Sequence, residues 1–115
     1  LCMCNPLYTK EIERSLKERF PHCSIACSSD ILIEIMNEGV TKADAINHLC
    51  DYYSINKQDI VAFGDNYNDK EMLESVGMGI AMGNAPDDIK NIANDVTSTN
   101  NQDGIFNALQ KLNII

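Results

Sequence analysis

The residues best suited to chemistry form a short polar run that directly follows an apolar one. Ile60–Phe63 is continuously apolar, and Gly64-Asp65-Asn66-Tyr67-Asn68-Asp69 follows it. The apolar run predicts a strand covered on both faces, as in a parallel sheet. Because ligands of open α/β sheets bind outside the carboxyl ends of the strands, we expect Asp65 at a binding edge. A carboxylate there needs a partner, since burying an unpaired charge is costly, and a hard cation such as Mg²⁺ is a natural one.

A purely structural explanation accounts for part of this run. Asn68, with Glu71 three residues later, fits a capping box at the start of a helix. That explanation accounts for Asn68 well and for Asp65 hardly at all. A calcium-binding EF-hand loop is excluded, because Tyr67 stands at its third position and Lys70 at the sixth, where glycine is required.

Lys42 is a second candidate, at the start of a predicted helix. Thr41 is suited to the N-cap and Asp44 to the third helical position, so Lys42 falls in the first turn. The helix dipole disfavours a cation there, whereas the free backbone N–H groups favour an anion. A lysine in this place fits a phosphate bound beside it. Taken alone, Lys42 is a solvated surface lysine, and the neighbouring Asp65 motif is what favours the phosphate interpretation.

The glycines of Gly77-x-Gly79-x-x-x-Gly83 do not predict a dinucleotide site. Their spacing differs from the dinucleotide fingerprint, and they enter a strand instead of a helix. We expect them to permit close packing and a tight turn.

The elements that must position these residues change character near Gly39. Before it, apolar residues at every fourth position predict a helix over 6–20, and a hairpin follows with strands 24–27 and 31–36 around the turn Ser28-Ser29-Asp30. After it, helices and buried strands alternate, which implies right-handed crossovers and a doubly wound α/β layer. The predicted helices are 41–53, 69–76, 86–93 and 105–112, and the predicted strands are 60–63, 78–82 and 95–97. We expect a domain boundary near Asn37–Gly39.

Composition narrows the classes of function. The chain has 115 residues and a formal net charge of −8, which argues against a nucleic-acid partner. No apolar stretch is long enough to span a bilayer and no leader pattern is present, so no membrane partner is expected and the cytoplasm is the default location. The five cysteines contain no C-x-x-C pair. Reduced thiols are therefore favoured over a zinc site built from His22, Cys23 and Cys27.

Four segments in a fixed order carry a resemblance to a known family. They are Gly39–Lys42, Val61–Asp69, Gly79–Ala85 and Thr99–Ile105. Together they look like the C-terminal end of Cof-type phosphatases of the haloacid dehalogenase (HAD) superfamily, and the resemblance runs from about Ile31 to the C-terminus. It implies an α/β fold, a Rossmann-like core with a parallel sheet and an α+β cap domain inserted in it. Residues 1–36 would then be the C-terminal piece of the cap domain, and residues 37–115 the C-terminal part of the core.

The resemblance also implies an activity and roles for four residues. The family consists of Mg²⁺-dependent phosphatases that hydrolyse small phosphorylated metabolites, such as sugar phosphates, through an aspartyl-phosphate intermediate. Lys42 matches the lysine that neutralises the phosphate and the nucleophile, and Asn68 matches the asparagine that contacts the phosphoryl group. Asp65 matches the catalytic, magnesium-binding aspartate. Asp69 matches the second acid of that loop. The resemblance implies that this acid supports the loop and belongs to the metal site.

The chain departs from the family in one large respect. It lacks the D-x-D-G-T/S segment that carries the nucleophile and the Ser/Thr motif that follows it. The expectation is therefore a C-terminal fragment that is inactive alone. A phosphosugar mutase of the same superfamily is an alternative. A non-catalytic α/β binding or assembly module is another, supported by the absent nucleophile and opposed by Lys42, Asp65 and Asn68 in family positions. Substrate identity and oligomeric state are left open.

Overall fold

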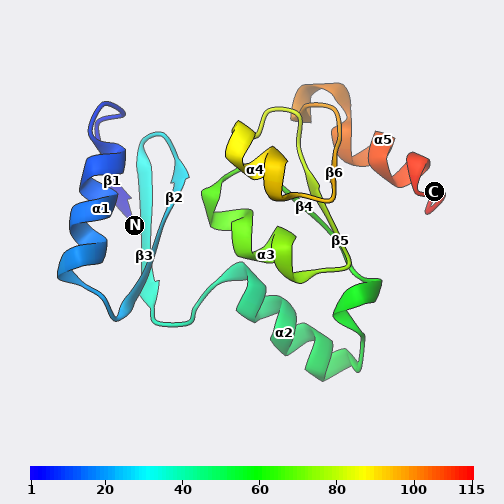
Figure 1. The fold of residues 1–115 in the computed structure, drawn as a ribbon, viewed down its shortest axis with the longest axis horizontal. Helices are drawn as coiled ribbons and strands as arrows, with labels where there is room; N and C mark the ends of the chain where they lie inside the picture. Colours follow the sequence, from blue (N-terminus) through cyan, green and yellow to red (C-terminus); the bar gives the residue numbers. More distant parts are fainter.

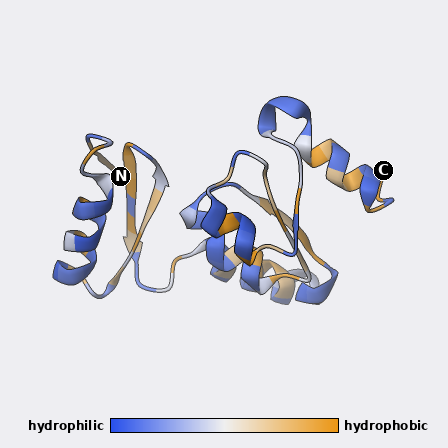
Figure 2. Cartoon of the chain, turned by 45° about the horizontal axis from the view of Figure 1, so that its top comes forward, coloured by the Kyte–Doolittle hydropathy of each residue, from blue (hydrophilic) through white to orange (hydrophobic).

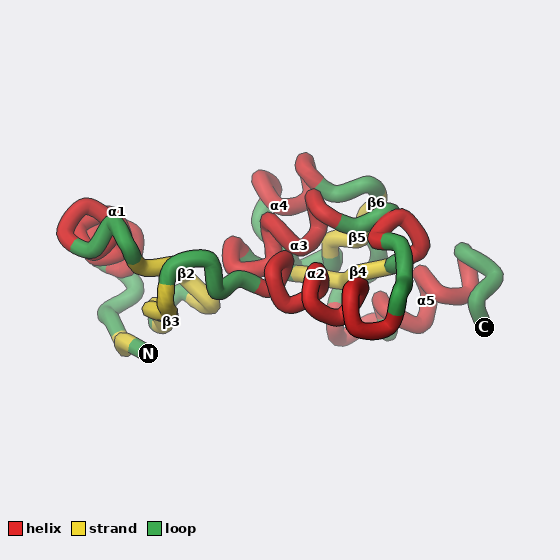
Figure 3. Tube along the Cα trace, turned by 90° about the horizontal axis from the view of Figure 1, so that it is seen from below, coloured by secondary structure: helices red, strands yellow, loops and turns green.

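The computed structural model describes residues 1–115 and contains two small sheets joined by a short connection (Figure 1; Figure 3 shows the same connection from below). The first sheet is antiparallel, with strand order β1-β3-β2, and comprises β1 (Cys2–Met3), β2 (Cys23–Ser29) and β3 (Leu32–Asn37). The second is parallel, with order β4-β5-β6, and comprises β4 (Val61–Gly64), β5 (Met78–Ala81) and β6 (Asp95–Val96). The predicted fold class, a parallel α/β layer preceded by an α+β piece, is confirmed.

The helices follow the predicted order; the first four are shorter than predicted, and the last is shifted by one residue toward the N-terminus. They are α1 (Thr9–Arg19), α2 (Lys42–Tyr53), α3 (Lys70–Ser75), α4 (Asp87–Ile92) and α5 (Gly104–Lys111). Single 3₁₀ turns occur at Lys57–Asp59, at Tyr67–Asp69 (η2) and at Asn100–Gln102. The predicted N-cap of α2 is confirmed, because the Thr41 hydroxyl accepts a hydrogen bond from the Asp44 backbone N–H at 3.1 Å. None of the helices is both long and apolar enough to cross a lipid bilayer.

The β2–β3 hairpin has one covered face. Ile25, Cys27 and Ile33 form a buried cluster against Ile12 and Leu16 of α1. Figure 2 shows the same division, with apolar residues on the strands and mainly polar residues along α1. The predicted turn at Ser28-Ser29-Asp30 is wrong, because β2 continues to Ser29 through a bulge, and the turn falls at residues 30 and 31.

Strand β1 was not predicted. It has only two residues, too few to show an alternating pattern, and it is defined by pairing with β3. The backbone N–H of Cys4 then donates to the carbonyl of Ile31 at 2.7 Å, which extends this link between the start of the chain and the hairpin.

The cysteines of the first sheet lie in or beside its apolar core. The Cys27 thiol donates to Glu13 Oε2 at 3.1 Å, and burial raises the pKa of Cys27 to about 12, so this thiol stays protonated. Burial also raises the pKa of Glu13, but hydrogen bonds from Lys17 and Cys27 outweigh it, and the pKa is lowered overall. Cys23 packs against the same core, whereas the side chain of His22 is 86% exposed.

The second sheet places the polar segments that follow its strands at one edge. In the parallel register of β4 and β5, Gly64 pairs with Ala81. Both strands therefore end at the same level, and the segments that begin with Asp65 and Met82 leave the sheet side by side. Helices α3 and α4 cover one face of the sheet through a cluster of Leu73, Ala81, Ala85 and Ile89.

Gly79 allows α3 to lie directly against β5. A Cβ atom added at Gly79 would lie 2.2 Å from the backbone carbonyl oxygen of Leu73. The expectation that this glycine permits close packing is confirmed. We expect Gly79→Ala to lower the free energy of unfolding by about 2–3 kcal/mol, because a backbone segment must move to admit the methyl group. Urea denaturation of the 115-residue chain measures this loss.

The control for this substitution is Gly39→Asn. Gly39 has a φ of +77° and no atom within 4 Å of an added Cβ, and asparagine tolerates the left-handed region better than other side chains. An equal loss of stability in both variants would contradict the packing role of Gly79.

Candidate active site

Asp65 and Asn84 meet at the carboxyl edge of the parallel sheet. Asp65 follows β4 and is exposed, and Asn84 lies in the segment after β5. The Asn84 side chain donates from Nδ2 to Asp65 Oδ2 at 2.9 Å, and its Oδ1 accepts from the Asn100 backbone N–H at 3.0 Å. One carboxylate oxygen of Asp65 is thus held by an amide, and Oδ1 makes no hydrogen bond within the chain.

Sequence reasoning assigned no role to Asn84, although a signal for it was present. Asn84 follows the end of β5 just as Asp65 follows the end of β4, and neighbouring parallel strands end at one edge. Treating both polar segments as parts of one site would have found it.

Asp69 is buried and holds Lys42 against the Asp65 segment. Only 4% of Asp69 is exposed. Its Oδ1 forms an ion pair with Lys42 Nζ, and its Oδ2 accepts from the backbone N–H groups of Asp65 at 2.9 Å and Asn66 at 3.3 Å. These contacts compensate the buried charge. They also bring Lys42 to the segment that contains the other three predicted site residues.

Gly64 makes room for this arrangement. A Cβ atom at Gly64 would lie 2.5 Å from Cβ of Asp69. Because Gly64 has no side chain, Asp69 can fold back beneath the end of β4 and reach two backbone N–H groups.

The predicted capping box of Asn68 and Glu71 is wrong. The box is formed by Asn66 and Asp69, two residues earlier: the Asn66 side chain accepts from the Asp69 backbone N–H, and the Asp69 side chain accepts from the Asn66 backbone N–H. Asn66 Oδ1 also accepts from the Tyr67 N–H at 2.8 Å. The chain accordingly turns at η2, before α3 begins at Lys70. The side chain of Asn68 makes no hydrogen bond within the chain, which leaves its amide available to a ligand.

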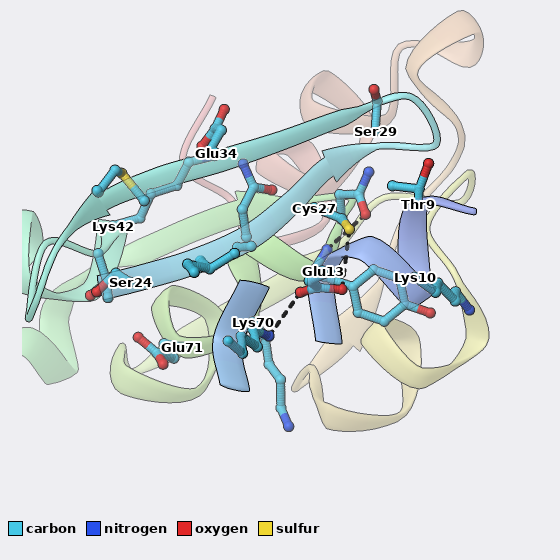
Figure 4. Close-up of a pocket in the computed structure, with 18 of the residues that line it drawn as sticks. Thr9, Lys10, Glu13, Ser24, Cys27, Ser29, Glu34, Lys42, Lys70 and Glu71 are labelled. Atoms are coloured by element: carbon cyan, nitrogen blue, oxygen red, sulfur yellow. Dashed lines mark hydrogen bonds and ion pairs between the residues drawn. The ribbon is translucent and has the colours of Figure 1, made fainter. Parts of the chain in front are cut away.

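A cleft of about 960 Å³ separates the hairpin and α1 from the start of α2 and the segment after β4. Figure 4 shows it with Lys42, Lys70 and Glu71 among its lining residues. Lys42 and Asn68 line the cleft, whereas Asp69 lies buried and Asp65 lies outside the lining, beside Asn84. The four predicted residues are therefore neighbours with different surroundings: a lysine and an asparagine line the cleft, one carboxylate is buried, and one is exposed beside Asn84.

The side chains at this edge suit a magnesium ion that is bound through one protein carboxylate, and they do not suit a metal site built from several protein ligands. No three His, Cys, Asp or Glu side chains gather to hold a metal ion. Asp65 offers an accessible carboxylate with one free oxygen, whereas both oxygens of Asp69 are engaged. Mg²⁺ keeps several waters and often binds through only one or two protein carboxylates. Asp65 is thus a suitable ligand, and the contacts of Asp69 suit a supporting role.

Comparison with other proteins identifies close relatives. Residues 3–109 match the family described as haloacid dehalogenase-like hydrolase. A Haemophilus influenzae protein is 50% identical over 101 residues, which cover 88% of this chain and 38% of the relative. The Bacillus subtilis 5-amino-6-(5-phospho-D-ribitylamino)uracil phosphatase YitU is 46% identical over 80 residues, covering 70% of this chain and 30% of the relative. The phosphatase YwpJ of the same organism is 34% identical over 108 residues, covering 91% and 38%.

Solved structures lead to the same family. The HAD subclass IIB sugar phosphatase BT4131 matches with a TM-score of 0.88 and 32% identity, covering 93% of this chain and 41% of that protein. The phosphatase BT1666 of Bacteroides thetaiotaomicron matches with a TM-score of 0.84 and 30% identity, covering 92% and 40%. The chain thus spans between 30 and 41% of the length of these relatives. By family match and by fold, this chain belongs to the haloacid dehalogenase-like hydrolases.

Proposed function

We propose that this chain is the C-terminal part of a Mg²⁺-dependent phosphatase that acts on small phosphorylated metabolites. Residues 1–36 would close its cap domain, and residues 37–115 would form the C-terminal part of its core. The observation that carries the proposal is the ion pair between Lys42 and Asp69, which are 27 residues apart. It brings a lysine to the segment that contains Asp65 and Asn68, beside a cleft between the two parts of the chain.

Each of the four residues has a role that suits its surroundings. The Lys42 ammonium and the Asn68 amide would hold phosphoryl oxygens from the cleft side. Preorganised hydrogen-bond donors are effective because negative charge in phosphoryl transfer is spread over these oxygens. Asp65 would hold Mg²⁺ through its free oxygen, with Asn84 fixing the other. When bound, the ion would neutralise charge on the phosphoryl group. Asp69 would keep Lys42 and the backbone of the Asp65 segment in place.

The nucleophile would come from outside this chain. In the proposed reaction, the first aspartate of a D-x-D-G-T/S segment attacks phosphorus, the bond from phosphorus to the leaving-group oxygen breaks, and the second aspartate of that segment donates a proton to the departing oxygen. Water then hydrolyses the aspartyl-phosphate and releases inorganic phosphate, so one difficult step becomes two easier ones. The residues of this chain contribute positioning and charge stabilisation to both steps.

The names of the relatives suggest the class of substrate. YitU is named for a phosphoribitylaminouracil and BT4131 for a sugar. The leaving groups named there share a polyhydroxylated carbon chain. We therefore propose that the substrate is the phosphate ester of a polyhydroxylated metabolite. The cytoplasmic location expected from the sequence stays a prediction.

The test joins this chain to the N-terminal part of the H. influenzae relative, which is 50% identical over the matched residues. We expect this chimera to hydrolyse p-nitrophenyl phosphate with Mg²⁺ and to lose roughly 10²-fold or more of the rate in excess EDTA, because the ion supplies several kcal/mol of charge stabilisation. We expect no hydrolysis by the 115-residue chain alone.

The controls separate the proposed phosphatase from its alternatives. Release of inorganic phosphate from a hexose phosphate supports a hydrolase, and isomerised sugar without free phosphate supports a mutase. A rate unaffected by EDTA would contradict the magnesium role. A folded chimera that is inactive on a panel of phosphate esters would favour a non-catalytic module.

A further inference from the structure

The Asn66 side chain joins two distant parts of the chain. Its Oδ1 accepts from the Tyr67 N–H at 2.8 Å, which caps η2. Its Nδ2 donates at 3.0 Å to the backbone carbonyl of Ser28, 38 residues earlier in the hairpin. Both ends of one amide are thus engaged, one within the Asp65–Asp69 segment and the other across to β2.

Strand β2 is suited to receive this contact. It lies at the edge of the first sheet, so its outward backbone groups have no neighbouring strand. An edge carbonyl needs a donor from elsewhere in the molecule or from water. Asn66 supplies that donor for Ser28, and Figure 1 shows β2 as the strand of the hairpin on the side that faces the second part of the chain.

A second contact joins the same two parts. The ammonium of Lys10, on α1, lies over the Tyr67 ring at 5.6 Å from its centroid. Tyr67 in turn packs against the core cluster of Leu73, Ala81, Ala85 and Ile89. Asn66, the N-cap of η2, therefore contacts the hairpin, and the adjacent Tyr67 contacts α1. We call the hairpin seated when both contacts are formed.

We propose that Asn66 is a positioning residue that couples the seating of the hairpin to the order of the Asp65–Asp69 segment. The Asn66 backbone N–H donates to Asp69, the acid that holds Lys42, while its side chain donates to the hairpin. A seated hairpin restricts the Asn66 amide to the rotamer that also caps η2. Docking of the hairpin therefore offsets part of the conformational entropy that the Asp65–Asp69 segment loses when it becomes ordered. The coupling is reciprocal: an ordered segment favours a seated hairpin.

The first test uses Asn66→Asp in the 115-residue chain. Aspartate keeps an oxygen to cap the Tyr67 N–H but replaces the donor to Ser28 with an acceptor. Residual dipolar couplings measured by NMR report whether the hairpin and the parallel sheet share one alignment tensor. We expect one tensor for the wild type and a lower order of the hairpin in the variant, with the unseated population raised roughly two- to tenfold by the loss of one hydrogen bond.

The matched control is Asn101→Asp, the same change of charge at an exposed residue whose side chain makes no hydrogen bond. In this control, the hairpin and the parallel sheet should still share one alignment tensor. Equal order of the hairpin in the wild type and Asn66→Asp would overturn the proposal. If Asn66→Asp disrupts η2 itself, Lys10→Gln removes the cation over the Tyr67 ring and loosens the hairpin while Asn66 itself is left unsubstituted. Faster amide exchange at Asp65 and Asn66 in Lys10→Gln supports coupling, and unchanged exchange refutes it.

The kinetic consequence rests on the proposed phosphatase function. In the active chimera, Asn66→Asp should raise KM by the same factor by which the NMR data show the seated fraction to fall, while kcat stays within about twofold, because a smaller fraction of molecules is competent to bind. A residue that served only to cap η2 would leave KM unchanged in this variant, since the cap is retained. If the chimera is inactive, the proposed function fails, and the NMR comparison still decides the role of Asn66.

Discussion

Replacing Asp65 with asparagine is expected to lower the Mg²⁺-dependent turnover of the chimera by roughly 10²–10³-fold. Asparagine has nearly the same shape, and its oxygen can still accept the hydrogen bond from Asn84 that Asp65 accepts at 2.9 Å. The geometry of the edge is therefore kept while the negative charge that would hold the cation is removed. The measurement is kcat/KM across a range of Mg²⁺ concentrations.

The matched control is Asp51→Asn. Asp51 is an exposed acid on α2 that makes no hydrogen bond or ion pair through its side chain. Its replacement changes the net charge by the same amount, and the rate should stay within about twofold. A rate near that of the wild type in Asp65→Asn, at every Mg²⁺ concentration, would refute the role proposed for Asp65.

Replacing Asp69 with alanine is expected to lower the free energy of unfolding by about 2–4 kcal/mol. The side chain of Asp69 is 6% exposed, and its loss removes an ion pair and two hydrogen bonds at once. The N–H groups of Asp65 and Asn66 lose their acceptor. Lys42, whose side chain is 51% exposed, turns to solvent at little cost, so most of the loss comes from the segment itself. Urea denaturation of the 115-residue chain measures the change.

Asp95→Ala is the control for the removal of an ion pair. Asp95 accepts from Lys111 Nζ at 2.6 Å, but both side chains are substantially exposed, and such pairs contribute within about 1 kcal/mol. Equal losses in the two variants would mean that Asp69 contributes no more than a surface pair. In the chimera, Asp69→Ala should also lower kcat, because Lys42 would no longer be held beside the Asp65 segment.

Local patterns were sufficient to predict the five helices, every strand except β1, and the placement of two site residues. The apolar run 60–63 predicted β4, and Thr41 with Asp44 predicted the start of α2. Both depend on neighbours within four residues: the pleat of a strand, the period of a helix and the hydrogen bond of an N-cap. Because parallel strands expose their carboxyl ends at one edge, the position of Asp65 followed from β4 alone.

The contacts that assemble the site depended on the tertiary structure. Asn66 and Asn68 are equally good caps by sequence, and the choice between them follows from where the Asp69 carboxylate lies. That place is set by the absence of a side chain at Gly64 and by Lys42 arriving from another helix. The contacts of Asn84 with Asp65 and of Asn66 with Ser28 span 19 and 38 residues. No local period or cap specifies such pairs, because they form only when separate elements pack together and their polar groups must find partners.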